Sequence, residues 1–202
     1  LTLSALVDSA LVREKYRDLW QATAQVATPH LRNMGTLGGN LCLDTRCTYY
    51  NQSQEWRKAI DFCLKKDGET CWVATASKRC VAVSSTDTAP ALIALGATVR
   101  LVSSQGERDV PLAALYKNDG IDYLTRRADE ILTEVTVADG WTSSYWKLRR
   151  RGSFDFPVLG VASAVKLAED GTVEEARLAL GAVASRPFLV EKAGEYLKGK
   201  KL

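Results

Sequence analysis

All five cysteines of this 202-residue chain fall in one short window, at positions 42, 47, 63, 71 and 80. A secreted disulfide scaffold usually spreads an even number of cysteines through a small chain, so an odd number in one window does not fit that class. Clustered thiolates are instead the ligands of zinc and of iron–sulfur clusters. The window therefore predicts a metal centre held by cysteine.

The spacing of the cysteines distinguishes between these metal centres. Successive gaps are 5, 16, 8 and 9 residues, so the Cys-x2-Cys pair of zinc ribbons and fingers is missing. The single histidine, His30, precedes the window, which disfavours a mixed Cys/His site. Four irregularly spaced thiolates can hold a cubane iron–sulfur cluster when a loop wraps around it. Buried free thiols remain an alternative, and Cys42 fits that alternative best because it lies in an apolar run.

A glycine-rich segment, Thr36-Leu37-Gly38-Gly39-Asn40, stands immediately before the cysteines. Glycine allows a tight turn and the close approach of a ligand to the backbone. Successive free N–H groups in such a turn can bind phosphate or the edge of a flavin. A merely structural hairpin or bulge is an equal alternative, and the segment is not the six-position dinucleotide fingerprint.

Regular elements are predicted on both sides of the window. Helices are expected in two segments within residues 1–27, over 54–64, between Asp87 and Gly96, at 112–116 and over 189–197. Strands are expected at 81–83, 97–102, 130–137, 142–149, 158–167 and 173–183, with a domain boundary at 138–140. Few helices and an antiparallel meander predict the α+β class.

Charge and composition exclude several classes of function. The chain has 27 basic and 24 acidic residues, mixed along its length, and a net charge of +3. The sequence has no basic stripe and no long apolar run, so it predicts binding neither to nucleic acid nor to a membrane. The expected location is cytoplasmic. Since the chain starts without Met and ends just after a predicted helix, we expect a piece of a longer polypeptide.

The residues around the window resemble a known family. The segment Thr36–Asn40, then Asp87 and a Pro-capped Leu/Ala helix ending in Leu-Gly-Ala, is similar to the flavin subunits of molybdenum hydroxylases, which include the xanthine dehydrogenase and CO dehydrogenase flavoproteins. The run Tyr145–Arg151, followed by Phe154-Asp155-Phe156, resembles the start of their C-terminal subdomain. The resemblance covers essentially the whole chain.

The resemblance implies two subdomains. Residues 1–138 correspond to an FAD-binding subdomain of the CO dehydrogenase flavoprotein type, without the N-terminal glycine-rich loop of the family, and with an inserted iron–sulfur loop at 42–80. Residues 140–202 correspond to an antiparallel-sheet-plus-helix C-terminal subdomain that is shorter than in the family. The implied fold class is α+β.

The insert is similar to that of one branch of the family, the β subunits of 4-hydroxybenzoyl-CoA reductases. That resemblance implies a [4Fe–4S] cluster with Cys47, Cys63, Cys71 and Cys80 as ligands, and leaves Cys42 outside. It also implies FAD binding by the following residues: Thr36, Leu37, Gly38, Gly39, Asn40, Asp87, Leu132 and Lys147. No residue is expected to act as a catalytic acid, base or nucleophile.

The implied activity is that of an electron-transfer subunit in a ferredoxin-linked molybdenum enzyme. This enzyme reductively dehydroxylates 4-hydroxybenzoyl-CoA to benzoyl-CoA, a reaction of anaerobic aromatic degradation. The expected partners, in a hetero-oligomer, are a molybdenum-cofactor subunit, a [2Fe–2S] subunit and ferredoxin as electron donor. Two alternatives stay open: the flavin subunit of an oxidative hydroxylase with inert or zinc-binding cysteines, and a zinc-stabilised scaffold without flavin.

Overall fold

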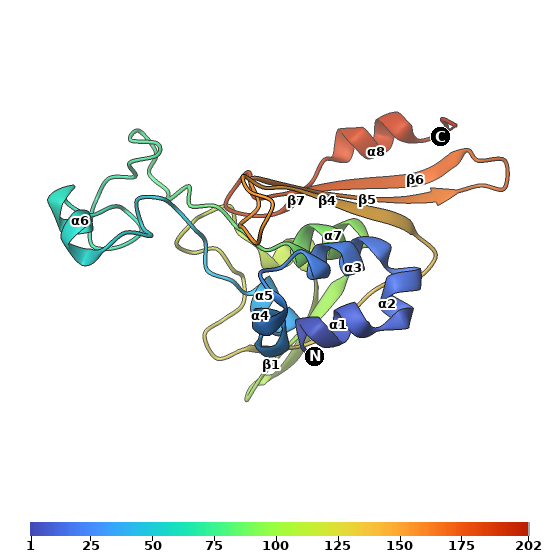
Figure 1. Ribbon diagram of the computed structural model, residues 1–202, viewed down its shortest axis with the longest axis horizontal. Helices are drawn as coiled ribbons and strands as arrows, with labels where there is room; N and C mark the ends of the chain where they lie inside the picture. The colour runs from blue at the N-terminus through green and yellow to red at the C-terminus, as the bar shows by residue number, and fades with distance from the viewer. Residues whose placement is uncertain (202) are drawn as a thin grey trace.

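Helix α7, Thr88–Ala94, lies at the centre of the protein with all seven residues buried (Figure 1). Beyond Thr88 its sequence is apolar on every side, which is typical of a helix without a solvent-facing surface. Helices α3, Arg17–Ala24, and α5, Leu37–Leu41, pack against it. Gly96, with φ of +73°, ends the segment in the left-handed conformation predicted for that position. The computed structural model describes residues 1–201.

The N-terminal region contains more helices than the sequence predicted. Helices α1, Leu3–Asp8, and α2, Ala10–Lys15, are separate because Ser9 ends the first and caps the second with its hydroxyl. Helix α4, Pro29–Met34, lies beyond the segments predicted within residues 1–27. The Thr28 hydroxyl caps α4, with proline at its first position.

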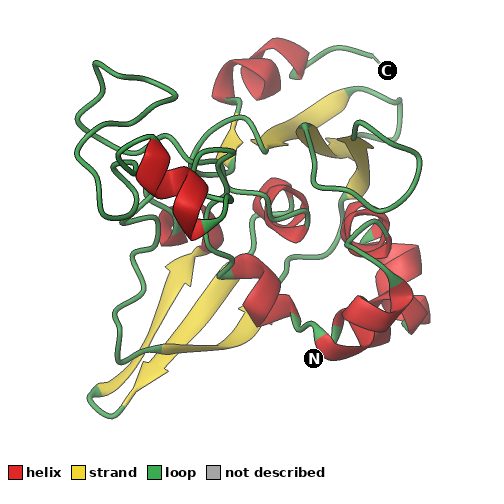
Figure 2. Cartoon of the chain, turned by 60° about the vertical axis from the view of Figure 1, so that its left-hand side comes forward, coloured by secondary structure: helices red, strands yellow, loops and turns green. Residues whose placement is uncertain are grey.

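Two antiparallel sheets flank these helices (Figure 2). The first has the strand order β2-β1-β3 and is followed along the chain by the second, β4-β5-β6-β7. Helices α3 and α7 cover one face of the second sheet and α8 packs on β6 from the other face (Figure 1). The bounds of the strands and remaining helices are β1 Thr98–Ser103, β2 Gly106–Pro111, the 3-10 helix η1 Leu112–Leu115, β3 Ile131–Thr136, β4 Thr142–Leu148, β5 Leu159–Leu167, β6 Val173–Gly181, β7 Phe188–Leu189 and α8 Glu191–Leu197.

The α+β class and the antiparallel C-terminal sheet with its helix are confirmed. Strands β4 and β5 alternate buried residues with more exposed ones along most of their length, as a sheet covered mainly on one face requires. Among residues 1–201, no helix combines the length and the apolar character needed to cross a bilayer.

The cysteine insert, residues 42–80, projects from this body as a loop with little regular structure (Figures 1 and 2). Its helix α6, Gln54–Ala59, is shorter than predicted because Asp61 and Phe62 adopt φ of +61° and +58°. The strand predicted at 81–83 is wrong as well. Only a bridge forms there, in which Arg46 and Val83 exchange two backbone hydrogen bonds of 2.8 Å and so close the base of the insert.

Candidate functional site

Four of the five cysteines meet in one small cavity inside the insert. Its lining includes Cys47, Cys63, Cys71 and Cys80. The last three are buried, Cys47 is half-buried, and all are free thiols. Cys42 lies elsewhere, beside the glycine segment. The four predicted ligands therefore share one cavity, and the fifth cysteine lies outside it.

Burial and neighbouring groups act in opposite directions on one of these thiols. Burial raises the pKa of the Cys80 thiol, and the charges of Cys71 and Cys47 raise it further, whereas a hydrogen bond from the Ala82 N–H and the charge of Lys65 lower it. Within residues 1–201, no three His, Cys, Asp or Glu side chains are placed to hold one metal ion.

The insert turns sharply around Cys63. The N–H groups of Lys66 and Gly68 both donate to the Cys63 carbonyl, at 2.9 and 3.1 Å. A Cβ atom on Gly68 would lie 2.7 Å from the Cys63 nitrogen, so a larger residue does not fit there. This tight turn, together with the left-handed Asp61 and Phe62, directs Cys63 into the cavity.

The body of the protein supports the cavity at Cys80. The Gly120 N–H donates to the Cys80 carbonyl at 2.9 Å. A Cβ on Gly120 would lie 2.6 Å from Cys80 Sγ, so the loop before β3 can approach the thiol this closely only with glycine. The loop before β3 therefore holds the insert in place, in addition to the tight turns within the insert.

The glycine segment is helical, so the predicted glycine turn is wrong. Thr36 caps α5 by accepting a hydrogen bond from the Gly39 N–H at 3.0 Å. Neither Gly38 nor Gly39 has a positive φ. Gly38 lies against β3, where a Cβ would make an ordinary van der Waals contact of 3.6 Å with the Leu132 side chain.

Three residues of this segment line a hollow together with Leu132. The full lining is Thr36, Gly38, Gly39, Cys42, Arg126, Glu130, Ile131 and Leu132. The other two residues face inward. Leu37 joins the hydrophobic core. The side-chain oxygen of Asn40, Oδ1, accepts hydrogen bonds from the hydroxyls of Thr86, at 2.8 Å, and Thr88, at 2.6 Å.

Asp87 and Lys147 form a buried ion pair with an N–O distance of 2.9 Å. The Tyr145 hydroxyl donates to the other Asp87 oxygen at 2.8 Å, and Lys147 also donates to the Gln25 carbonyl at 3.0 Å. Burial raises the pKa of Asp87, and Lys147 and Tyr145 oppose that rise. Tyr145 was not predicted as a site residue. It lies two positions before Lys147 on β4, so strand alternation would have placed both on one face.

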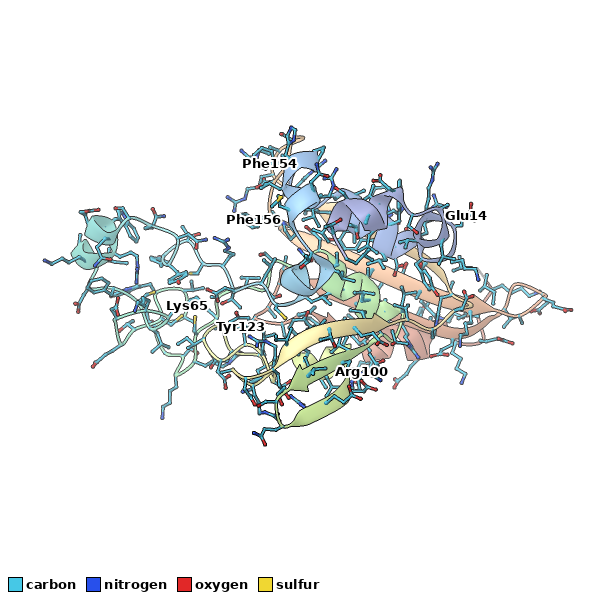
Figure 3. The ribbon with its side chains drawn as sticks, turned by 90° about the horizontal axis from the view of Figure 1, so that it is seen from below. Glu14, Lys65, Arg100, Tyr123, Phe154 and Phe156 are labelled. Atoms are coloured by element: carbon cyan, nitrogen blue, oxygen red, sulfur yellow. The ribbon has the colours of Figure 1, made fainter. Side chains whose placement is uncertain are left out.

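Asn40 and Asp87 border a second hollow, which the loop beyond β4 covers with Phe154 and Phe156 (Figure 3). This hollow shares Ser85, Asp155 and Phe156 with a longer groove that reaches Cys47. The Ser85 hydroxyl is buried without a hydrogen-bond partner among the described residues. A buried polar atom of this kind is normally satisfied, so its position favours a ligand in the hollow.

The two segments of the chain match two families. Residues 1–138 match the family described as "FAD binding domain in molybdopterin dehydrogenase", and residues 143–202 match the "CO dehydrogenase flavoprotein C-terminal domain". The aldehyde oxidoreductase FAD-binding subunit PaoB of Escherichia coli (strain K12) is 32% identical over 197 residues, which cover 92% of this chain and 60% of that protein. The nicotinate dehydrogenase FAD-subunit of Eubacterium barkeri is 28% identical over 205 residues, covering 100% of this chain and 56% of that protein.

Solved structures share the fold. Carbon monoxide dehydrogenase from Hydrogenophaga pseudoflava superposes with a TM-score of 0.73 at 22% identity, over 100% of this chain and 57% of that one. Quinoline 2-oxidoreductase from Pseudomonas putida 86 superposes with a TM-score of 0.68 at 23% identity, over 100% of this chain and 56% of that one.

The chain spans between 56% and 60% of the length of these two curated relatives. The first family match nevertheless covers well over half of the chain, and the second begins a few residues after it ends. The chain therefore belongs to the family of FAD-binding domains of molybdopterin dehydrogenases and continues into the C-terminal domain of the CO dehydrogenase flavoproteins.

Proposed function

We propose that this chain is the FAD- and [4Fe–4S]-carrying part of a molybdenum enzyme that reductively dehydroxylates 4-hydroxybenzoyl-CoA to benzoyl-CoA. The family supports FAD. The observation that carries the rest is the insert, in which four cysteines line one cavity beside the FAD-binding fold. The choice of substrate rests on the resemblance of this insert to that of the reductase β subunits.

The cluster would be held by four thiolates and FAD by two hollows. The ligands are Cys47, Cys63, Cys71 and Cys80. Of the residues proposed to bind FAD, Thr36, Gly38, Gly39 and Leu132 line the first hollow, and Asn40 and Asp87 border the second. Lys147 would act through its ion pair with Asp87, and Leu37 would support the segment from the core. When bound, the cluster supplies one-electron transfer and FAD supplies one- and two-electron transfer.

The protein's own residues hold and shield these groups. The Tyr145 hydroxyl and Lys147 fix the Asp87 carboxylate, so its position at the second hollow does not depend on a ligand. Tyr49 and Trp72 contribute aromatic rings to the lining of the cysteine cavity, where they would reduce the contact of a cluster with water. The groove extends from the second hollow to Cys47, so it borders both the proposed FAD site and the proposed cluster site.

The remaining partners follow from the same resemblance. A molybdenum-cofactor subunit would bind the substrate, a [2Fe–2S] subunit would lie between it and this chain, and ferredoxin would deliver electrons. The names of two relatives, an "FAD-binding subunit" and an "FAD-subunit", support a place in a hetero-oligomer.

Metal analysis of the complete complex, purified without oxygen, tests the cluster. We expect about four irons and four sulfides per chain beyond those of the [2Fe–2S] subunit. Cys63→Ser and Cys71→Ser should each lose most of this iron and the ferredoxin-dependent activity, because each removes a ligand. Cys42→Ser is the matched control for iron content and should keep its iron, since Cys42 lies outside the cysteine cavity. Full iron content in the Cys63 and Cys71 variants would refute the ligand set.

A second candidate is the flavin subunit of an oxidative molybdenum hydroxylase in which the insert is only structural. The names of the relatives, an aldehyde oxidoreductase and a nicotinate dehydrogenase, favour it. It predicts FAD without iron beyond that of the [2Fe–2S] subunit, and no ferredoxin-dependent reduction of 4-hydroxybenzoyl-CoA. Stoichiometric zinc without flavin would instead identify a zinc-stabilised scaffold.

A further inference from the structure

Lys65 is a buried lysine at the edge of the cysteine cavity. Its side chain is only 7% exposed, which is rare for lysine because burial removes water from the ammonium. Three acceptors replace that water: Asp44 Oδ1 at 2.8 Å, Thr45 Oγ1 at 2.8 Å and the Gly120 carbonyl at 2.6 Å. All three N–H bonds of the ammonium are thus used by the protein.

The surroundings of Lys65 fix its charge in place. The ammonium lies 5.0 Å from the ring centre of Tyr50 and 5.7 Å from that of Tyr123, both within the range of cation–π attraction. Lys65 and Tyr123 come from segments far apart in the sequence, yet lie beside each other where the insert meets the body (Figure 3). The position of the charge is therefore determined before any cofactor binds.

The same residue borders the four cysteines. Lys65 lines their cavity, and its acceptor Gly120 is the residue that packs directly against Cys80 Sγ. Among residues 1–201, the one acidic side chain that pairs with Lys65 is Asp44, which is 48% exposed, so water screens the carboxylate charge more than it screens the ammonium. Lys65 therefore places a positive charge at this edge of the cavity.

We propose that Lys65 is a fixed cation that raises the reduction potential of the cluster held by the four cysteines. The inference rests on the proposed function and extends it, since Lys65 is a positioning and tuning residue and not a ligand. Four thiolates make the cluster negative, and the electron accepted from a reductant adds one negative charge with no bond formed or broken. A nearby buried cation stabilises the reduced form more than the oxidised form.

A redox titration of the complete complex, followed by electron paramagnetic resonance, tests this role. Lys65→Gln should retain its iron and sulfide but shift the midpoint potential of the cluster to a more negative value. Lys65→Arg keeps the charge and should restore the wild-type potential. Lys66→Gln is the matched control, because Lys66 is the next residue and its side chain is 58% exposed. A wild-type potential in an iron-replete Lys65→Gln protein would overturn the proposal.

A second variant covers the case in which Lys65→Gln loses its iron because the insert detaches. Asp44→Asn leaves the ammonium on Thr45 and Gly120 but removes the partly compensating anion, so the potential should become more positive. An unchanged potential in Asp44→Asn would then refute the role of Lys65. A wild-type complex without a cluster would refute the ligand assignment itself, which distinguishes failure of the proposed function from failure of this inference.

Discussion

Two buried carboxylates of this protein, Asp87 and Asp18, differ in whether a positive charge lies beside them. Asp87 is neutralised by Lys147, whereas Asp18, with none of its surface exposed, has only neutral partners. Its Oδ1 accepts from the Ser143 hydroxyl at 2.8 Å and from the Leu19 N–H at 2.7 Å, and its Oδ2 has no partner among the described residues. Burial raises the pKa of Asp18 to about 7, against the opposing effect of these hydrogen bonds.

Asp18 should make the stability of the protein fall as pH rises. The folded state keeps a proton that the unfolded chain releases near pH 4, so the contribution of Asp18 to stability is present below about pH 4 and is lost as pH rises to about 7. We expect Asp18→Asn to remove this dependence. Between pH 4 and 8, the free energy of unfolding of the wild type should fall relative to the variant by on the order of 3 kcal/mol.

Urea unfolding followed by tryptophan fluorescence over this pH range measures the difference. The exposed Asp8 provides the control, because Asp8→Asn should leave the pH dependence of the wild type intact. Parallel curves for the wild type and Asp18→Asn would show that Asp18 does not titrate in this range.

At the scale of elements, the insert depends on the loop that precedes β3. This loop supplies the Gly120 backbone to Cys80 and an acceptor to Lys65, so it connects the cysteine cavity to the FAD-binding body. The insert contains one short helix and is closed by a two-bond bridge. Such a loop has few stabilising contacts of its own, and its geometry must come from outside partners.

Gly120→Ala should therefore damage the cluster site without unfolding the body. The new Cβ would lie 2.6 Å from Cys80 Sγ and 2.8 Å from the Ala82 backbone nitrogen, so the loop or the thiol must move. We expect at least a twofold loss of iron, with flavin content unchanged. Gly152→Ala is the control, because nothing lies within 4 Å of a Cβ there. Iron analysis and flavin absorbance give the two readouts, and equal iron in both variants would contradict the prediction.

At the scale of the whole molecule, the two family segments share one buried helix. Helix α7 belongs to the first segment, yet it packs on β5 and β6 of the second. The contact is close enough that a Cβ on Gly181 would lie 2.5 Å from the ring of Pro90. Neither segment can be separated from the other without exposing this apolar surface, so we infer that they unfold together.

Gly181→Ala tests this coupling. The overpacked contact should cost about 1–3 kcal/mol and lower the stability of the protein in a single transition. Calorimetry and far-ultraviolet circular dichroism should report the same midpoint for the variant. Two resolved transitions, with only one of them shifted, would show that the segments unfold independently.

The sequence alone determined most of the regular elements of this protein. Strands β1, β3, β4, β5 and β6 and helices α7 and α8 lie within one or two residues of the predicted ends, because their alternation, their glycines or their apolar runs act locally. The number and type of the cysteines predicted a metal centre for the same reason, since thiolate chemistry does not depend on the fold. The local pattern did not predict α4, which begins at the Thr28 cap. It predicted α6 too long, because the left-handed Asp61 and Phe62 end that helix early.

Only the tertiary structure decided which of these residues meet. Asp87 and Lys147 are 60 residues apart, and Lys65 and Gly120 are 55 apart, so no periodicity in the sequence could pair them. Cys47 and Cys80 share a cavity because a non-repeating loop bends back through tight turns and is held against the body. Contacts between distant segments depend on how packed elements orient them, which is a property of the folded chain as a whole.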